Sequence, residues 1–140
     1  MNKGDLLISN GVIVNSKGKC KGNILIKDGK IAAILSPEEE AEASKSIDAK
    51  GRYIIPGGVD GHTHMMDPGY TDREEFATGT AAAAYGGITT VIDHHRTIPA
   101  VYSVKEHLEK VEYLSDKSVV DFGLKGGGSP DNVDKLEDMW

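Results

Sequence analysis

The sequence has very little cysteine and no long hydrophobic run. Its one cysteine, Cys20, has no second thiol in the chain with which to form a disulfide. The first residues, MNKGDLLISNG, lack the apolar core of about 7–15 residues that a signal peptide requires. The most apolar later stretch, TAAAAYGGITTVI, is shorter than the roughly 20 apolar residues of a membrane-spanning helix. These absences predict a cytoplasmic protein without a membrane partner.

Positive charge is also scarce. Lysine and arginine total 16 against 22 acidic residues, so the formal net charge is -6 and the pI is near 5.3. Nucleic-acid binding relies on clustered lysine and arginine, and this balance argues against such a partner. With 39% hydrophobic and 27% charged residues, the composition is typical of a globular protein.

Residues 1–55 predict a small antiparallel β unit. Asn-Gly and Asp-Gly pairs favour tight hairpin turns, which places turns at Asn10-Gly11 and Asp28-Gly29. A weaker strand pair is expected on either side of residues 49–51. The acidic run of residues 36–44 has no apolar face and predicts a solvated loop or helical turn.

Residues 56–140 predict alternating strands and helices. Strand signals precede His64 and recur at 88–94 and 118–124, while helix signals cover 72–86 and 99–117, with a further helix opening at 131–140. This rhythm is typical of a parallel α/β sheet or barrel. Three βα units cannot close an eight-stranded barrel, which needs about 250 residues. The pattern therefore fits either a short open α/β domain or the N-terminal part of a larger domain.

Two histidines stand at the end of the first strand of this second part. Residues i and i+2 of a strand point to the same face, so His62 and His64 project side by side and can converge on one metal ion. Asp60 lies two residues further back and is placed to orient an imidazole. The alternative is that both histidines are hydrogen-bonded residues at a strand end, because His-x-His alone is a short pattern.

The stretch PGGVDGHTH, residues 56–64, resembles the first-strand signature Pro-Gly-x-x-Asp-x-His-x-His of the amidohydrolase superfamily. Residues 67–93 are similar to the segment that follows it in the cyclic amidohydrolases, namely allantoinases, dihydroorotases, hydantoinases and dihydropyrimidinases. The strand pattern of residues 1–55 also resembles theirs. The resemblance implies a small antiparallel β-sandwich unit over 1–55, followed over 56–140 by the first three βα units of a (β/α)8 TIM barrel.

The resemblance further implies a metal-dependent hydrolase of cyclic amide bonds, allantoinase- or hydantoinase-like, that acts on a small cyclic amide or ureide. Members of the family hold two divalent ions, often zinc, bridged by a carboxylated lysine, and usually form tetramers. Only His62 and His64 match ligand positions of the family. Lys125 comes one strand too early for the bridging lysine, which is expected shortly after residue 140. The 140-residue chain alone is therefore expected to be inactive.

Departures from the family bear on the substrate. Met66 stands where dihydroorotases have an arginine for the substrate carboxylate, and a thioether cannot make that contact. His95 and Arg96 follow the second strand and are candidate substrate contacts, the alternative being a solvent-facing loop. Two alternative hypotheses for the function remain. One is dihydroorotase activity, and the other is a non-catalytic dihydropyrimidinase-related protein used for assembly or binding. The retained histidines favour the enzyme. The sequence does not separate a truncation from a proteolytic fragment or an interrupted gene.

Overall fold

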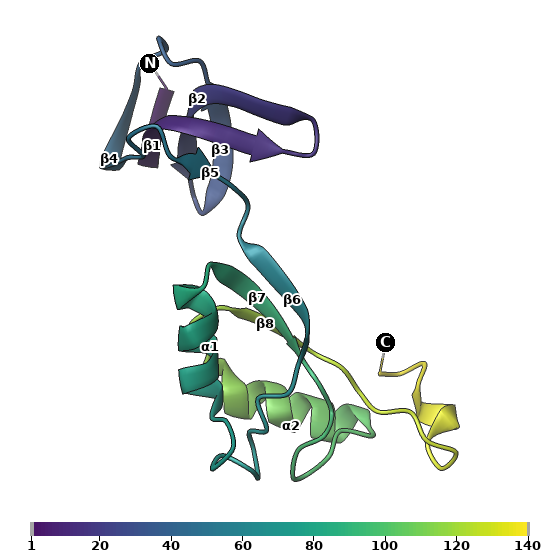
Figure 1. Ribbon diagram of the computed structural model, residues 1–140. Coiled ribbons are helices and arrows are strands. Elements are labelled where there is room, and N and C mark those ends of the chain that lie inside the picture. The colour runs from purple at the N-terminus through teal and green to yellow at the C-terminus, as the bar shows by residue number, and fades with distance from the viewer. Residues whose placement is uncertain (1, 140) are drawn as a thin grey trace. The chain divides into compact units, whose positions relative to one another are not determined.

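The computed structural model describes residues 2–139. The chain divides into two compact units, an N-terminal unit that ends at Pro56 and a C-terminal unit that begins at Gly57. Both units contain a β-sheet, and only the C-terminal unit contains α-helices among the described residues (Figure 1).

The N-terminal unit is built on one mixed five-stranded sheet in the order β3-β2-β1-β4, with β5 also paired to β1. Its strands are β1 (Asn2–Asn15), β2 (Gly18–Lys27), β3 (Lys30–Leu35), β4 (Ala41–Asp48) and β5 (Tyr53–Ile54). β2 is antiparallel to β1 and β3, whereas β4 and β5 run parallel to β1. The expectation of a wholly antiparallel unit is therefore wrong. The strands flanking residues 49–51 pair with β1 rather than with each other, because the Ala49 and Gly51 amides bond to the Ser9 and Asn10 carbonyls of β1.

The prediction of a hairpin turn at Asn10-Gly11 is also wrong. β1 continues through these residues, and its register with β2 shifts between Ile8 and Gly11, which marks a β-bulge. Asn10 has a φ of 56°, a left-handed conformation that asparagine tolerates better than most residues. The same property that suits Asn-Gly to a hairpin thus serves a bulge. The Asp28-Gly29 hairpin is confirmed, with φ values of 52° and 71° between β2 and β3.

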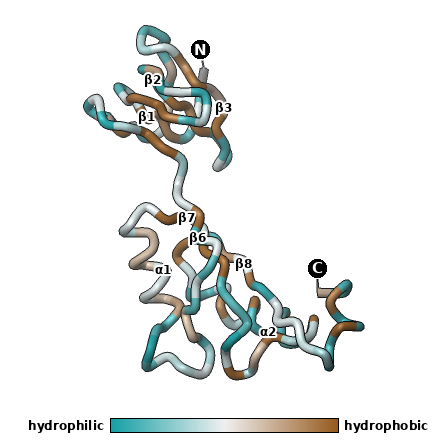
Figure 2. Tube along the Cα trace, turned by 45° about the vertical axis from the view of Figure 1, so that its right-hand side comes forward, coloured by the Kyte–Doolittle hydropathy of each residue, from teal (hydrophilic) through white to brown (hydrophobic). Residues whose placement is uncertain are grey.

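The acidic run does not stay in a loop throughout. Residues 41–44 belong to β4, which pairs with β1 along its length, so this part of the expectation is wrong. Backbone pairing overrides the weak propensity of Ala, Glu and Ser for strands. Hydrophobic stretches lie along β1, β2 and β3 (Figure 2). The buried apolar side chains of the unit are Ile13, Ile24, Leu25 and Leu35.

The C-terminal unit alternates strands and helices, as the sequence pattern predicted. It comprises β6 (Gly58–Thr63), α1 (Phe76–Tyr85), β7 (Ile88–Asp93), α2 (Val104–Ser115), β8 (Asp121–Leu124) and a short 3-10 helix η1 (Val133–Lys135). The three strands form a parallel sheet in the order β6-β7-β8. The helix expected over 131–140 is reduced to η1, and Trp140 lies outside the described residues.

Helix α1 begins at Phe76, four residues after the start of the helix signal at residue 72. Its N-cap is Glu75, and the buried Asp67 carboxylate accepts a hydrogen bond from the Phe76 amide at 3.1 Å. The helix ends at the C-cap Gly86, where the sequence predicted its end. The terminal amide thus obtains its acceptor from a residue nine positions earlier, which the local cap pattern does not reveal.

One buried cluster joins the sheet to both helices. Phe76 of α1, Leu114 of α2 and Val91 of β7 are fully buried, and Met65 closes the cluster beside them. The Phe122 ring of β8 meets Phe76 edge-on, with centroids 5.3 Å apart. Because Phe76 of α1 and Leu114 of α2 share one buried cluster with Val91, both helices pack on the same face of the sheet.

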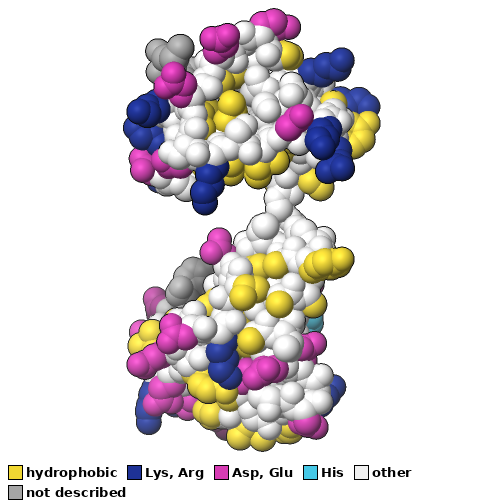
Figure 3. Space-filling model, turned by 90° about the vertical axis from the view of Figure 1, so that its left-hand side faces the viewer, with side chains coloured by type: hydrophobic (Ala, Val, Ile, Leu, Met, Phe, Trp, Pro, Cys, Tyr) yellow, Lys and Arg dark blue, Asp and Glu magenta, His cyan; other side chains and the backbone are white. Residues whose placement is uncertain are grey.

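The surface retains several large apolar side chains. Hydrophobic side chains are visible among charged ones on both units in Figure 3. In the C-terminal unit, Val59 on the edge strand β6 is 67% exposed, and Tyr85 at the end of α1 is 98% exposed. Among residues 2–139, no helix has the length and apolar character needed to cross a bilayer.

Candidate metal centre

The site lies where β6 and β7 end. Thr63, the last residue of β6, pairs in register with Asp93, the last residue of β7. The His94 amide then donates a hydrogen bond to the Thr63 carbonyl at 3.0 Å. Parallel strands end at the same edge of a sheet, so the residues that follow them lie side by side. This pairing brings His94 beside the two histidines that flank Thr63.

Three imidazoles converge at this edge. The Nε2 atoms of His62 and His64 are 3.3 Å apart. The His94 ring lies 3.9 Å from the His62 ring and 4.7 Å from the His64 ring, measured between centroids. One nitrogen from each of the three rings lies within 4.8 Å of the other two. This group could hold a metal ion, because imidazole nitrogen is a common ligand for divalent transition metals.

Alternation along the strands explains why the rings gather on one face. Val91 and Asp93 of β7 are buried on the side covered by helices, and Met65 joins the same core. Residues one position away point to the opposite face. His94 follows Asp93, and His64 precedes Met65, so both rings leave the helix-covered side.

A buried ion pair holds the backbone behind the rings. The Lys110 ammonium of α2 lies 2.7 Å from the Asp93 carboxylate, and it also donates to the His94 carbonyl at 2.9 Å. The other carboxylate oxygen of Asp93 accepts a hydrogen bond from the Met65 amide at 2.8 Å. One lysine and one aspartate thereby tie the segments after β6 and β7 together. The sequence pattern gave no indication of this role for Lys110, which lies within the amphipathic helix α2.

Asp60 does not make the ring contact expected of it. Its carboxylate accepts a hydrogen bond from the His62 backbone amide at 3.1 Å, and the side chain is exposed. The register of β6 with β7 is irregular between Asp60 and Thr63, so the strand does not keep strict alternation there. The side chain therefore supports the backbone at His62 instead of its imidazole.

Lys125, which follows β8, reaches across to β6. Its ammonium donates to the Gly61 carbonyl at 2.8 Å, next to His62. This contact adds a positive charge beside the three rings. Burial lowers the pKa of His94, and the neighbouring His62 and His64 rings and Lys125 lower it further. The neutral imidazole, which is the form that binds a metal, is thereby favoured.

The candidate substrate residues lie in the segments that follow these strands. Met66 is half-buried and has a φ of 59°. His95 is half-buried and meets the Tyr102 ring edge-on at 5.4 Å, whereas Arg96 is exposed. Burial lowers the pKa of His95, and the Arg96 charge lowers it further. None of the three belongs to the group of converging imidazoles.

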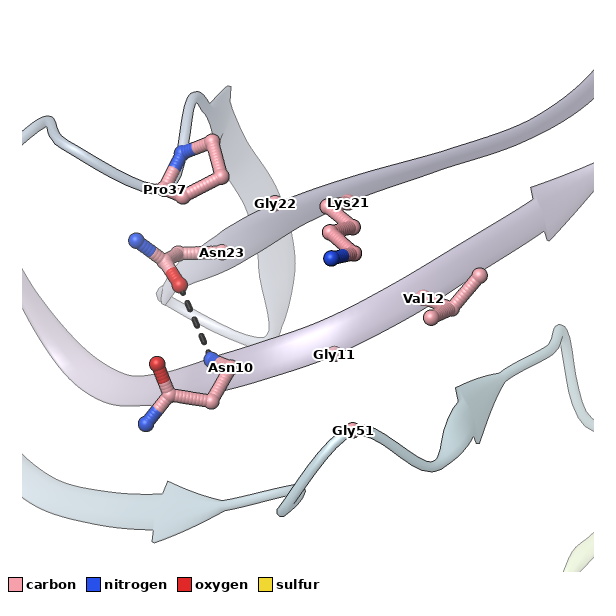
Figure 4. A pocket seen from close by; sticks show the side chains of 8 residues that line it. All are labelled: Asn10, Gly11, Val12, Lys21, Gly22, Asn23, Pro37 and Gly51. Atoms are coloured by element: carbon pink, nitrogen blue, oxygen red, sulfur yellow. Dashed lines mark hydrogen bonds between the residues drawn. The ribbon is translucent and has the colours of Figure 1, made fainter.

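A pocket of about 250 Å³ lies in the N-terminal unit, next to the bulge of β1 (Figure 4). Asn23 is almost fully buried there, and its side-chain oxygen accepts a hydrogen bond from the Asn10 amide at 3.0 Å. Its side-chain nitrogen donates to the Ser36 carbonyl at 3.2 Å. Both ends of the amide are thus used to join β1, β2 and the end of β3, which makes this contact structural.

Comparison with known proteins decides the family. The sequence profile of the Amidohydrolase family matches residues 53–134, which is more than half of the chain. The chain belongs to the amidohydrolase family. This membership confirms the resemblance seen around His62 and His64.

Individual amidohydrolases resemble almost the whole chain. The solved structure of an L-hydantoinase (dihydropyrimidinase) from Arthrobacter aurescens matches 97% of this amidohydrolase chain with a TM-score of 0.93 and 39% identity. A dihydroorotase of Methanosarcina mazei is 39% identical over 136 residues, 97% of the chain. An allantoinase of Deinococcus radiodurans is 37% identical over 136 residues, 96% of the chain. The chain spans about 30% of the length of each of these proteins.

Proposed function

We propose that this chain contributes the first metal-binding strands of a cyclic amidohydrolase whose catalytic domain is a (β/α)8 barrel. The observation that carries the proposal is the convergence of His62, His64 and His94 at the carboxyl edge of three parallel strands. Barrel enzymes build their active sites at this edge. The exposed Val59 on β6 supports further strand pairing, because an open apolar edge is a site for adding strands.

The residues at this edge fit a divalent ion such as zinc. The donors are imidazole nitrogens, and the His94 Nε2 is buried without a hydrogen-bond partner among the described residues. When bound, such an ion polarises the carbonyl of a substrate amide and acidifies water. The chain's own contribution is to fix the backbone that carries the rings, through Asp60 at the His62 amide and through Lys110 at the His94 carbonyl.

The substrate we propose is a small cyclic amide or ureide, hydantoin- or allantoin-like. Met66 has no charge to offer a substrate carboxylate such as that of dihydroorotate. The exposed Arg96 is available for a polar substrate group, and the His95 ring is steadied by Tyr102 beside it. In the complete barrel, Arg96→Met is expected to raise KM more than it lowers kcat, since it removes a binding contact and no metal ligand.

A chimera tests the proposal. Residues 1–140 replace the matching 30% of the L-hydantoinase, and metal-dependent ring opening is assayed with hydantoin, allantoin and dihydroorotate. We expect turnover of hydantoin or allantoin that falls at least about 100-fold in His62→Ala and His64→Ala. His107→Ala, on the helix α2 and outside the imidazole group, is the matched control and is expected to keep the activity.

A folded, zinc-loaded chimera that opens none of the three rings would contradict the proposal and favour the non-catalytic relative. Turnover of dihydroorotate alone would retain the hydrolase and overturn the substrate class. The 140-residue chain by itself is expected to show no turnover, because the rest of the barrel supplies the bridging lysine and the further ligands that the family resemblance implies.

A further inference from the structure

The fit of His62 and His64 to one ion can be judged from their spacing. Two ligands that each lie about 2.0–2.1 Å from a tetrahedral ion are separated by roughly 3.3–3.4 Å. The two Nε2 atoms of His62 and His64 are 3.3 Å apart. Two neutral imidazoles gain only one weak hydrogen bond from this approach, whereas a shared cation would satisfy both nitrogens.

The main chain of His94 is held beside this pair by two hydrogen bonds. Its amide bonds to the Thr63 carbonyl at 3.0 Å, and its own carbonyl accepts from the buried Lys110 at 2.9 Å. Both anchors are main-chain contacts at the position itself. The Cα of His94 is therefore fixed at a point from which its ring reaches the two histidines on either side of Thr63.

The His94 ring also has an unused donor atom. Its Nε2 is buried and has no hydrogen-bond partner among residues 2–139. A buried polar nitrogen left unpaired is unfavourable, and a bound cation would satisfy it. The three ligand nitrogens lie within 4.8 Å of one another, so a small movement of the His94 ring completes a three-imidazole set.

We propose that this chain binds one divalent transition-metal ion through three imidazoles, those of His62, His64 and His94. Three histidines with an open fourth position are an established donor set for zinc. The inference shares His62 and His64 with the proposed function, but it requires neither turnover nor any residue outside these 140. His94 is the new ligand.

Cadmium NMR counts the ligands directly. The metal-free 140-residue protein, labelled with 15N-histidine, is loaded with one equivalent of 113Cd2+, and one-bond coupling between cadmium and ring nitrogens is recorded. The chain has 5 histidines, so His95 and His107 serve as internal controls. We expect three coupled rings, of which one is lost in His94→Gln while the other two remain. Zinc competition against a chromophoric chelator should show a weakening of at least about tenfold in His94→Gln and no change in His95→Gln.

Each other result overturns the inference. Coupling at His62 and His64 alone removes His94 from the site and leaves the ligands of the proposed function in place. Coupling at His95 or His107 moves the site elsewhere. No coupling at all shows that three imidazoles do not suffice, and the chimera then decides the proposed function independently. The wild-type protein gives this answer by itself, so the test does not depend on the folding of a variant.

Discussion

The Lys110 ammonium lies 2.7 Å from the Asp93 carboxylate, and the two side chains are only 3% and 1% exposed. The pair links helix α2 to the end of β7. Because Asp93 also accepts from the Met65 amide, and Lys110 also donates to the His94 carbonyl, the pair fixes both segments that carry the histidines. An interaction between two charges in the core thus sets the geometry of the exposed site.

We expect Lys110→Met to lower the free energy of unfolding by about 3–5 kcal/mol, because it leaves the Asp93 carboxylate buried without its partner. Urea unfolding monitored by circular dichroism measures the change. Lys105→Met is the matched control on the same helix, where the ion pair with Glu109 is exposed and 3.8 Å long. Its effect should stay within about 0.5 kcal/mol. Equal effects of the two substitutions would show that the buried pair has no special role.

Lys110 should also affect metal binding. Groups that orient a metal ligand typically contribute about 10–100-fold to affinity. Lys110→Met is therefore expected to weaken zinc binding by that factor under conditions in which the variant is still folded. The competition titration measures this, and unchanged affinity in a folded variant would contradict the positioning role.

Asp67 should make stability depend on pH. Burial alone raises the pKa of this carboxyl, but the hydrogen bond from the Phe76 amide and the Lys117 ammonium at 3.0 Å outweigh it, and the net pKa is lowered. A lowered folded-state pKa contributes stability above the unfolded value of about 3.9 and loses it as the pH falls through the folded value. Asp67→Asn should therefore cost about 1.5–3 kcal/mol at neutral pH and progressively less toward pH 2.

Urea unfolding of wild type and Asp67→Asn across this pH range provides the comparison. Asp72→Asn, in an exposed position of the same loop, is the matched control. A difference between wild type and Asp67→Asn that grows on acidification would have the wrong sign and would refute the assignment.

Asn23 should be a stability determinant of the N-terminal unit. Asn23→Leu keeps the size of the side chain but removes the partners of the Asn10 amide and the Ser36 carbonyl. Leaving buried polar groups unpaired costs about 1–3 kcal/mol, so the urea midpoint of the unit should fall accordingly. Asn15→Leu removes an exposed hydrogen bond to the Lys17 amide, which water replaces, and should have little effect. A neutral result for Asn23→Leu would show that the bulge of β1 does not need this side chain.

Local patterns predicted the C-terminal unit well, because its elements are defined by local signals. The β-branched run at 88–93, the Gly86 stop and the apolar spacing of α2 each depend on residues close in sequence. The N-terminal unit was predicted less well, because its outcome depends on long-range pairing. Nothing within Asn10-Gly11 distinguishes a hairpin turn from a bulge, and the choice is made by the contacts of β1 with β2 and β4.

Only part of the candidate site could be predicted from the sequence, because local patterns do not reveal long-range pairing. His62 and His64 stand out because they lie two residues apart. His94 is 30 residues later, and its relation to them appears only through the register of Thr63 with Asp93. A signal was nevertheless present: His94 follows the last residue of the next parallel strand, as His64 follows Thr63. Lys110 carried no such signal, since a lysine within an amphipathic helix is normally solvated.

The alternation of side chains at the ends of β6 and β7 separates residues that are needed for folding from residues that are available for metal binding. Residues facing the helices, such as Val91 and Met65, belong to the buried cluster and are constrained by folding, whereas the neighbouring His62, His64 and His94 lie outside that cluster. Substitutions of the imidazoles can therefore accumulate without loss of the folded state. A lineage carrying this unit could exchange its metal, or abandon metal binding altogether, while the scaffold persisted unchanged.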